Sequence, residues 1–309
     1  MKKVYLGIDM GGTRIKLGLL DEGGNLLETE TLPAKSDRTM EVRLSELVED
    51  INRILCDNYK LLGIGIAFPG VVDNINNKIL SKYVKYTDAH KTNLNDWAEI
   101  NWNVPLVIEN DARAALIGEW QYGAGKGSDN ILMVTLGTGM GSAILVEGKL
   151  LRGRNSLAGN LGGHMSIDFE GDTCNCGNVG CVETAGSTWA LARNLTKINN
   201  YQNSKLSSLS SFGYKDVFDL ASNGDEVAEK LKNKSLEAWS AGIINLLHAY
   251  DPELLIIGGG IMKSKNEIIP FIKKKINERS WLPKDAVKIT TANQTKYAGI
   301  LGACHLLKN

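Results

Sequence analysis

Apolar runs separated by glycine-rich turns dominate the start of the chain. Residues 3–9 (Lys-Val-Tyr-Leu-Gly-Ile-Asp) predict a buried strand, and the turn Gly11-Gly12-Thr13 follows. Residues 15–20 predict a returning strand, and residues 26–32 predict a third strand after a hairpin turn at 21–25. We therefore expect an antiparallel meander with a glycine turn between its first two strands.

The order of strand, glycine turn and strand occurs a second time. Residues 131–136 and 142–146 predict two strands on either side of the Gly-Thr-Gly-Met-Gly segment at 137–141. This repetition indicates an internal duplication. We expect each half to contribute one hairpin that faces a phosphate group.

The rest of the pattern alternates helices with short strands. Apolar residues recur at helical spacing over residues 40–60. Further helices are predicted at 112–120, 187–196, 215–249 with a break near 223–225, 266–278 and 297–307, and further strands at 62–68, 104–109, 254–257 and 287–290. The polar, serine-rich stretch 199–211 predicts a loop.

Composition narrows the class of protein. A length of 309 residues favours two domains, each with its own core. Lys+Arg and Asp+Glu both number 35, so the charge balance gives no reason to expect a nucleic-acid or membrane partner. The first apolar run is too short for a signal peptide, and no uncharged run is long enough to span a membrane. The cysteines form no paired framework, so we expect a cytoplasmic protein.

One histidine and three cysteines lie close together in a glycine-rich stretch. His164, Cys174, Cys176 and Cys181 fall within eighteen residues, a spacing that can close a tetrahedral Cys₃His zinc site. Buried core cysteines are one alternative, but the stretch offers little apolar packing. A disulfide is another, but it would use only two of the three thiols and would leave the histidine unexplained.

Six motifs follow one another over nearly the whole chain. They are GIDMGGT (7–13), GIGIAFPG (63–70), ENDA (109–112), LGTGMG (136–141), the loop from His164 to Cys181 with Glu183, and IIGGG (256–260). Together they resemble the ROK family (repressor, open reading frame, kinase) of the actin-like ATPase superfamily.

The resemblance implies an α/β fold of two duplicated actin-like (ribonuclease H-like) βββαβα domains around a cleft. We expect the first domain to span residues 1–115 with a closing helix at 297–309, and the second to span 116–296 with the zinc loop at 164–181. The family also implies ATP and Mg²⁺, a structural Zn²⁺, a sugar as phosphoryl acceptor, and a homodimer. Some members are repressors with an added N-terminal DNA-binding module. We expect none here, because the first strand begins at Lys3.

Glycine turns can bring backbone N–H groups close to phosphates. We expect the two turns to contact the β- and γ-phosphates, although each turn alone could be a tight hairpin. Asp9 is expected to face Mg²⁺ through water. The third glycine run resembles the family's adenosine loop, but a strand-to-helix turn would also explain it. The expected ATP and Mg²⁺ residues are Asp9, Gly11, Gly12, Thr13, Gly137, Thr138, Gly139, Gly258, Gly259 and Gly260.

Asp111 is the expected catalytic base, which accepts the proton of the sugar hydroxyl. Its place at a helix start predicts a lowered pKa, so it would orient the hydroxyl more than deprotonate it. A plain N-cap role is the alternative. By resemblance, the sugar-binding residues are Gly70, Asn110, His164 and Glu183, and His164 is also a zinc ligand.

One position departs from the family pattern. The family has a glutamate three residues before the histidine, and this chain has Leu161 there, unless a shifted loop places Asn160 in that role. Phosphoryl transfer should survive the change, whereas sugar preference should differ. We predict a glucokinase-like ATP-dependent kinase for a hexose or 2-acetamido hexose. A non-catalytic sugar-sensing regulator on the same scaffold is the alternative.

Overall fold

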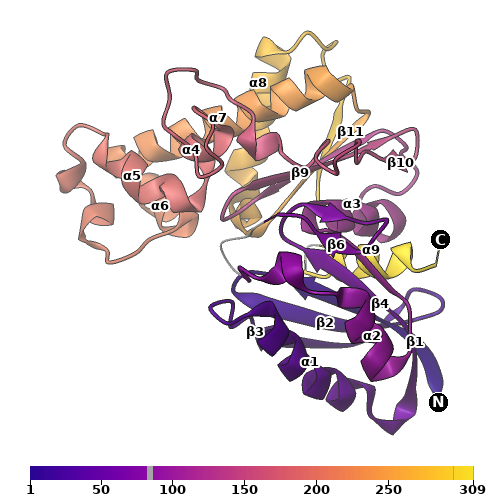
Figure 1. The fold of residues 1–309 in the computed structure, drawn as a ribbon. Helices are drawn as coiled ribbons and strands as arrows, with labels where there is room; N and C mark the ends of the chain where they lie inside the picture. Colours follow the sequence, from indigo (N-terminus) through magenta and orange to yellow (C-terminus); the bar gives the residue numbers. More distant parts are fainter. Residues whose placement is uncertain (82–85, 295, 309) are drawn as a thin grey trace. The chain divides into compact units, whose positions relative to one another are not determined.

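Two five-stranded mixed sheets share one strand order (Figure 1). The first is β3-β2-β1-β4-β7 and the second is β10-β9-β8-β11-β12. In each sheet three strands form an antiparallel meander and two later strands join in parallel. The strands are β1 (Lys2–Met10), β2 (Arg14–Asp21), β3 (Leu26–Pro33), β4 (Tyr59–Phe68), β7 (Leu106–Asn110), β8 (Ile131–Leu136), β9 (Met140–Val146), β10 (Lys149–Leu150), β11 (Leu254–Gly258) and β12 (Lys288–Thr291). The repeated topology confirms the predicted duplication and the α/β class.

The structure is a computed structural model that describes residues 1–81, 86–294 and 296–308. Its chain forms two units. Unit 1 comprises Met1–Gly127, Leu151–Ala158 and Asn293–Asn309, and unit 2 comprises Ser128–Leu150 and Gly159–Ala292. The expected boundary after residue 115 falls inside helix α3 (Asp111–Tyr122), all of which belongs to unit 1. The last residue of the expected closing segment, 309, lies outside the described residues.

A row of glycines explains how the C-terminal helix α9 (Ala298–Leu306) packs on the first sheet. Gly7 pairs with Gly18 on one side and with Gly65 on the other, so the three lie side by side across β2, β1 and β4. A Cβ atom on any of them would come closer than 3 Å to Ile300 or Ala303. The missing side chains therefore let α9 contact the sheet directly, and Figure 1 shows this helix (yellow) among the elements of unit 1.

Two elements of unit 1 differ from the prediction. Helix α1 is Met40–Leu55 and does not reach residue 60, because Cys56 has a positive φ of 36° and β4 begins at Tyr59. Helix α2 (Leu94–Trp102) and the short hairpin β5–β6 (Val72–Asp73 and Lys78–Ile79) were not predicted. Only Leu94 and Ala98 of α2 are buried, which leaves a weak periodic signal.

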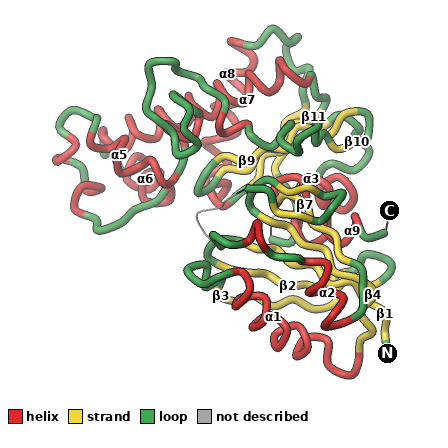
Figure 2. Tube along the Cα trace, viewed as in Figure 1, coloured by secondary structure: helices red, strands yellow, loops and turns green. Residues whose placement is uncertain are grey.

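Helices dominate the rest of unit 2 (Figure 2). They are α4 (Val182–Gly186), α5 (Leu191–Thr196), α6 (Tyr214–Ser222), α7 (Glu226–Tyr250) and α8 (Lys265–Arg279), and the break between α6 and α7 lies where the sequence predicted it. The long helix α7 anchors its neighbours through Trp239, which is fully buried and donates from its indole N–H to the carbonyl of Gly186 at 2.6 Å. This bond fixes the end of α4, the helix that carries Glu183.

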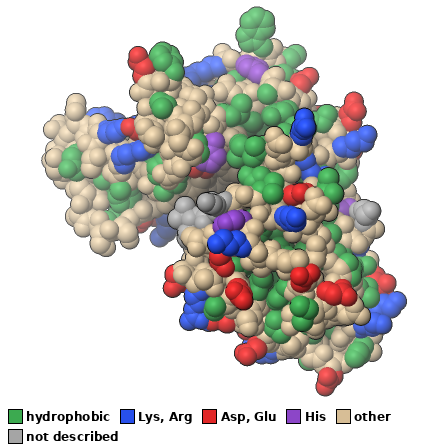
Figure 3. Space-filling view, in the orientation of Figure 1, with side chains coloured by type: hydrophobic (Ala, Val, Ile, Leu, Met, Phe, Trp, Pro, Cys, Tyr) green, Lys and Arg blue, Asp and Glu red, His purple; other side chains and the backbone are tan. Residues whose placement is uncertain are grey.

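The described helices include none with the length and apolar character that a bilayer span requires. On the face shown in Figure 3, Lys and Arg side chains are interspersed with Asp and Glu. This mixture is what the equal counts of basic and acidic residues predict.

Candidate functional site

The first glycine turn of unit 1 joins β1 to β2. The hydrogen bonds that hold its backbone include one from Ser36 Oγ to the carbonyl of Gly12 (2.9 Å) and one from the Ala34 N–H to the carbonyl of Thr13 (3.0 Å). A Cβ on Gly11 would lie 2.7 Å from the carbonyl oxygen of Arg14, so this position requires glycine. The turn therefore has a fixed backbone, as a phosphate-binding turn needs.

Asp9 lies near the end of β1, opposite Lys16 on β2. The Lys16 ammonium donates to Asp9 Oδ2 at 2.6 Å, and the two side chains are 28% and 20% exposed. A partly exposed carboxylate beside a glycine turn suits Mg²⁺, which prefers oxygen ligands and keeps several of its waters. Sequence reasoning missed Lys16, although its position opposite Asp9 followed from the predicted meander.

Asn110 ends β7 and caps helix α3. Its Oδ1 accepts from the backbone N–H groups of Ala112 (3.1 Å) and Arg113 (3.2 Å). Its Nδ2 donates to the Gly70 carbonyl and to Asp111 Oδ1, both at 3.0 Å. Asn110, rather than Asp111, is therefore the N-cap residue. The contact also brings the two distant motifs ENDA and GIGIAFPG together.

The pKa of Asp111 moves in the direction opposite to the one the helix dipole predicts. Desolvation by the surrounding protein is the larger cause and the negative charge of Asp9 the second, and together they raise the pKa of the Asp111 carboxyl to about 6. Hydrogen bonds from Ala112 and Asn110 lower it by less. The residue itself stays exposed. Asp111 is therefore a stronger base than the sequence suggested, poised close to neutral pH.

A buried ion cluster lies directly behind this pair. Glu109 is 0% exposed, and its Oε2 accepts a hydrogen bond from Arg152 Nε at 2.8 Å. Its Oε1 forms an ion pair with Nη1 of Arg113 at 3.6 Å. Glu109 Oε1 also accepts from the backbone N–H of Asn110 at 2.9 Å. Arg113 donates to the carbonyls of Ser156 and Ala158. The cluster thus ties the start of α3 to the 151–158 segment of unit 1.

The second glycine turn, in unit 2, lies against Glu183. Glu183 Oε1 accepts from the backbone N–H of Met140 at 2.9 Å, and Oε2 accepts from the indole of Trp189 at 3.2 Å. A Cβ on Gly139 would overlap Glu183 Oε1, so glycine is required there. The Gly137 carbonyl accepts from the Thr188 hydroxyl at 2.9 Å. The expected phosphate turn and the expected sugar residue are therefore in direct contact.

The third glycine run lies beside the same turn. Gly258 ends β11 and pairs with Thr135, two residues before Gly137. Gly259 has a φ of 100°, and a Cβ there would overlap Leu136, so another residue would be strained and crowded. Gly260 then starts a short 3₁₀ helix, Gly260–Ser264. The run turns from a strand into a short helix and adjoins the 137–139 turn, and its expected role in adenosine binding stays a prediction.

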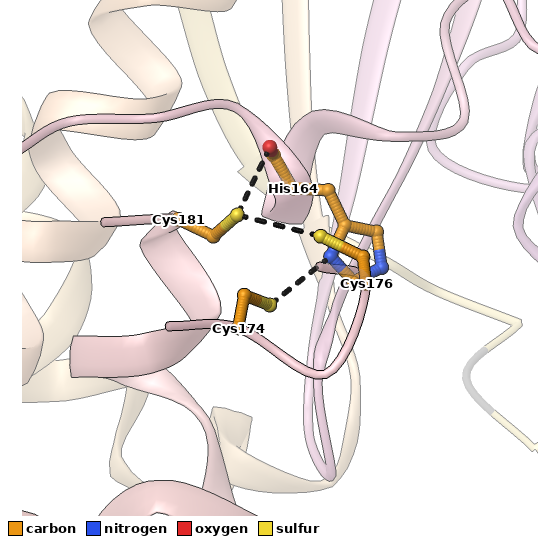
Figure 4. Close-up of side chains that lie close together, drawn as sticks. All are labelled: His164, Cys174, Cys176 and Cys181. Carbon is orange, nitrogen blue, oxygen red and sulfur yellow. Dashed lines mark hydrogen bonds between the residues drawn. The ribbon is translucent and has the colours of Figure 1, made fainter. Parts of the chain in front are cut away.

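Figure 4 shows the four predicted metal ligands around one point. The ligand atoms of His164, Cys174, Cys176 and Cys181 all lie within 4.8 Å of one another. His164 Nδ1 is 3.6 Å from Cys174 Sγ, and Cys176 Sγ is 3.7 Å from Cys181 Sγ. All five cysteines, each within the described ranges, are free thiols, so the disulfide alternative is excluded here.

The separations of 3.6 and 3.7 Å match those of a tetrahedral zinc site. Tetrahedral bonds of about 2.3 Å to sulfur and 2.0–2.1 Å to nitrogen place neighbouring ligand atoms roughly 3.6–3.8 Å apart. The donor set of three thiols and one imidazole is also typical of structural zinc. Because Cys181 directly precedes α4, a metal bound here would fix the start of the helix that carries Glu183.

The stretch before His164 contains a buried side-chain oxygen that accepts no hydrogen bond from the described residues. Leu161 is 38% exposed, whereas Oδ1 of its neighbour Asn160 is buried and has no hydrogen-bond partner within the part of the chain that the structure describes. A buried acceptor without a partner costs roughly 1–3 kcal/mol. A ligand hydroxyl could satisfy it. Asn160 is thus a second candidate for the role of the family glutamate.

Comparison with known proteins places the chain in a family. The sequence pattern of the ROK family matches residues 5–309. A glucokinase of Thermotoga maritima is 30% identical over 314 residues, which cover 99% of this chain and 98% of that protein. A xylose repressor of Bacillus spizizenii is 30% identical over 278 residues, or 89% of this chain and 68% of that protein. Among solved structures, a ROK family glucokinase from Streptomyces griseus in complex with glucose and AMPPNP has a TM-score of 0.81 and 29% identity, with 98% of each chain covered.

The family match agrees with the observed topology, the glycine turns and the Cys₃His cluster. It extends over nearly every residue of both units. The chain therefore belongs to the ROK family.

Proposed function

We propose that this chain is an ATP-dependent sugar kinase that phosphorylates a hydroxyl of a hexose or 2-acetamido hexose. The observation that carries the proposal is Asp111, a carboxylate with a pKa near 6 held by a capped helix start. The glucokinase relatives support a sugar as acceptor, and the AMPPNP complex of the S. griseus enzyme supports ATP as donor.

In the proposed reaction Asp111 takes the proton of the sugar hydroxyl. Its Oδ1 accepts from the Ala112 N–H (2.8 Å) and from Asn110. No other described residue donates a hydrogen bond to Oδ2, so we assign Oδ2 as the proton acceptor. The hydroxyl oxygen forms a bond to the γ-phosphorus, the bond to the β–γ bridging oxygen breaks, and ADP leaves. Mg²⁺, when bound, neutralises phosphate charge, and Asp9 is the residue we assign to hold it through water.

The proposal assigns phosphate binding to the turns at 11–13 and 137–139 and adenosine binding to the run at 258–260. Rigid backbone turns lower the reorganisation needed when charge develops during transfer. Thr188 and Glu183 support the second turn through the contacts described above. These groups act by positioning, which is most of what phosphoryl transfer requires.

Sugar binding is assigned to Gly70, Asn110, His164 and Glu183. His164 uses Nδ1 in the metal cluster, which leaves Nε2 for a sugar hydroxyl. Each oxygen of Glu183 accepts one protein hydrogen bond and can accept another. The side-chain amide of Asn110 already donates both of its hydrogen bonds within the protein, so a hydrogen bond to a sugar would replace one of them.

The proposal also includes a homodimer, which sedimentation would detect as twice the mass of one chain.

A non-catalytic sugar-sensing regulator is the second candidate, because a xylose repressor shares the 30% identity of the glucokinase, although over 278 residues rather than 314. ADP release on adding a panel of hexoses, 2-acetamido hexoses and ketoses to protein with ATP and Mg²⁺ separates the two. Sugar-dependent ADP release supports the kinase. Sugar binding without ADP release across the panel would support the regulator.

A further inference from the structure

The proposed reaction assigns no role to Arg152, the partly exposed member of the buried ion cluster. Arg152 lies in the 151–158 segment of unit 1, 43 positions from Glu109 in the sequence. Its side chain is 28% exposed, whereas those of Glu109 and Arg113 are 0% exposed. Because this cluster lies directly behind Asn110 and Asp111, a change at Arg152 can reach the proposed base.

Arg152 provides the closest side-chain contact of the buried Glu109 carboxylate. Its Nε donates to Glu109 Oε2 at 2.8 Å. Arg113 lies 3.6 Å from the other oxygen, which is beyond the roughly 2.7–3.2 Å of a hydrogen bond. Among the described residues, Arg152 is therefore the one side chain that donates a hydrogen bond to Glu109. A buried carboxylate needs such a donor, so the orientation of Glu109 depends on Arg152.

A continuous series of hydrogen bonds leads from Glu109 to Asp111. Glu109 Oε1 accepts from the backbone N–H of Asn110 at 2.9 Å. The side chain of Asn110 caps helix α3 and donates to Asp111 Oδ1 at 3.0 Å. Because Glu109 bonds the backbone of Asn110, a tilt of the Glu109 carboxylate moves the residue that orients the proposed base.

The 151–158 segment is held at both ends. Arg113 donates to the carbonyls of Ser156 at 3.2 Å and Ala158 at 2.6 Å, and Arg152 bonds Glu109 at the beginning of the segment. Arg154 lies between these points, and its exposed side chain forms no hydrogen bond or ion pair with another described residue. The segment thus contains two arginines two positions apart, of which one is bonded to the cluster and the other is not.

The effect of Arg152 on Asp111 is one of geometry rather than charge. Desolvation and the charge of Asp9 raise the pKa of Asp111, and hydrogen bonds from Asn110 and the start of α3 lower it. None of these causes is the charge of Arg152. Removal of Arg152 should therefore change the orientation of the Asp111 carboxyl and leave its pKa nearly the same.

We propose that Arg152 is a positioning residue of the kinase reaction, which orients Asp111 through Glu109 and Asn110. In this role it acts through these residues rather than on the sugar or ATP. The inference rests on the proposed function, because it takes Asp111 as the base. Without the bond from Arg152, the Asp111 carboxyl is held less well toward the sugar hydroxyl, and a small misplacement lowers the rate of transfer.

Initial rates of ADP release by the full chain, with the preferred sugar, ATP and Mg²⁺, test the proposal. Arg152→Met keeps an apolar stem but removes every donor, so kcat should fall by about tenfold or more while the KM for ATP stays within about twofold. Arg154→Met is the matched control and should keep kcat within about twofold of wild type. Arg152→Lys keeps a cation that can bond Glu109, and it should recover part of the lost rate.

The pH profile separates loss of orientation from a general loosening of the structure. The midpoint of kcat/KM near pH 6 should stay in Arg152→Met, because Asp111 remains desolvated. A midpoint that falls toward 3.8 would show that water reaches Asp111, and this would overturn a role in orientation alone. If Arg152→Met does not fold, Arg152→Lys decides, and a wild-type kcat in that variant would overturn the inference.

The remaining outcomes are distinct. Equal kcat in wild type and Arg152→Met would overturn the inference and leave the proposed function standing. Equal losses in Arg152→Met and Arg154→Met would also overturn it, because the segment as a whole would then matter rather than the bond to Glu109. A wild-type chain without sugar-dependent ADP release would refute the proposed function, and the role of Arg152 with it.

Discussion

The side-chain amide of Asn110 donates a hydrogen bond to Oδ1 of Asp111, with 3.0 Å between the two atoms. The Ala112 N–H donates to the same oxygen at 2.8 Å. Both bonds orient the carboxyl group and leave Oδ2 for a substrate. The orientation of the proposed base is therefore determined by its own helix start.

The raised pKa of Asp111 predicts how activity depends on pH. Only the ionised carboxylate accepts a proton, so kcat/KM should rise as pH rises through about 6. One unit below that pKa it should be about a tenth of its plateau. Initial rates between pH 4.5 and 8 measure this. A profile that is flat between pH 5 and 7 would contradict the assigned base.

The same shift predicts a stability effect. A carboxyl whose folded pKa exceeds its unfolded value contributes stability at low pH, and this contribution is lost as pH rises from 3.8 through about 6. Asp111→Asn should therefore raise the melting temperature at pH 8 more than at pH 4. Asp37→Asn, at an exposed position, is the control for the loss of a carboxyl group as such. Equal changes in melting temperature for both substitutions at both pH values would show that the pKa of Asp111 is not raised in the folded protein.

Zinc content tests the Cys₃His cluster. Purified protein should carry one zinc per chain, and Cys176→Ala should lose zinc, thermal stability and sugar affinity together. Cys56→Ala is the matched control, because Cys56 is also an exposed thiol but lies outside the cluster. Elemental analysis gives the ratio. Folded, active wild-type protein without metal would exclude a structural zinc.

The buried ion cluster should matter for stability. Glu109→Gln leaves Arg113 buried beside a neutral group, which should cost roughly 3–5 kcal/mol of unfolding free energy. Glu278→Gln breaks an exposed pair with Lys274 and should change stability by less than about 1 kcal/mol. Urea denaturation measures both. If Glu109→Gln lowers the unfolding free energy as little as Glu278→Gln does, the cluster does not stabilise the start of α3.

The sequence predicted the features that depend on residues close together in the chain and missed those that depend on residues far apart. The meander, the glycine turns and the Cys₃His cluster depend on neighbouring residues, and the structure has them where the sequence placed them. The Glu109–Arg152 pair joins residues 43 positions apart and resembles two surface charges in sequence. The predicted direction of the Asp111 pKa shift was wrong for a similar reason. The helix dipole is local, whereas desolvation and the charge of Asp9 come from the fold.

Sugar preference should depend on the stretch before His164. If Leu161 occupies the position of the family glutamate, Leu161→Glu should raise kcat/KM for glucose relative to the preferred sugar by about one to two decades and leave the KM for ATP nearly unchanged. If Asn160 fills the role, its buried Oδ1 is the acceptor, and Asn160→Ala should lower kcat/KM instead. Steady-state kinetics over the sugar panel separate the two. No change with either variant would remove both residues from sugar recognition.

The central claim is that Asp111 is the base of a sugar kinase, and turnover by Asp111→Asn tests it most directly. With the preferred sugar, ATP and Mg²⁺, ADP release should fall by about 10²–10⁴-fold while calorimetric sugar affinity is kept, because the amide retains both hydrogen bonds to Oδ1 but cannot take the proton. Retention of more than about a tenth of the wild-type kcat would contradict the account and remove Asp111 from the mechanism.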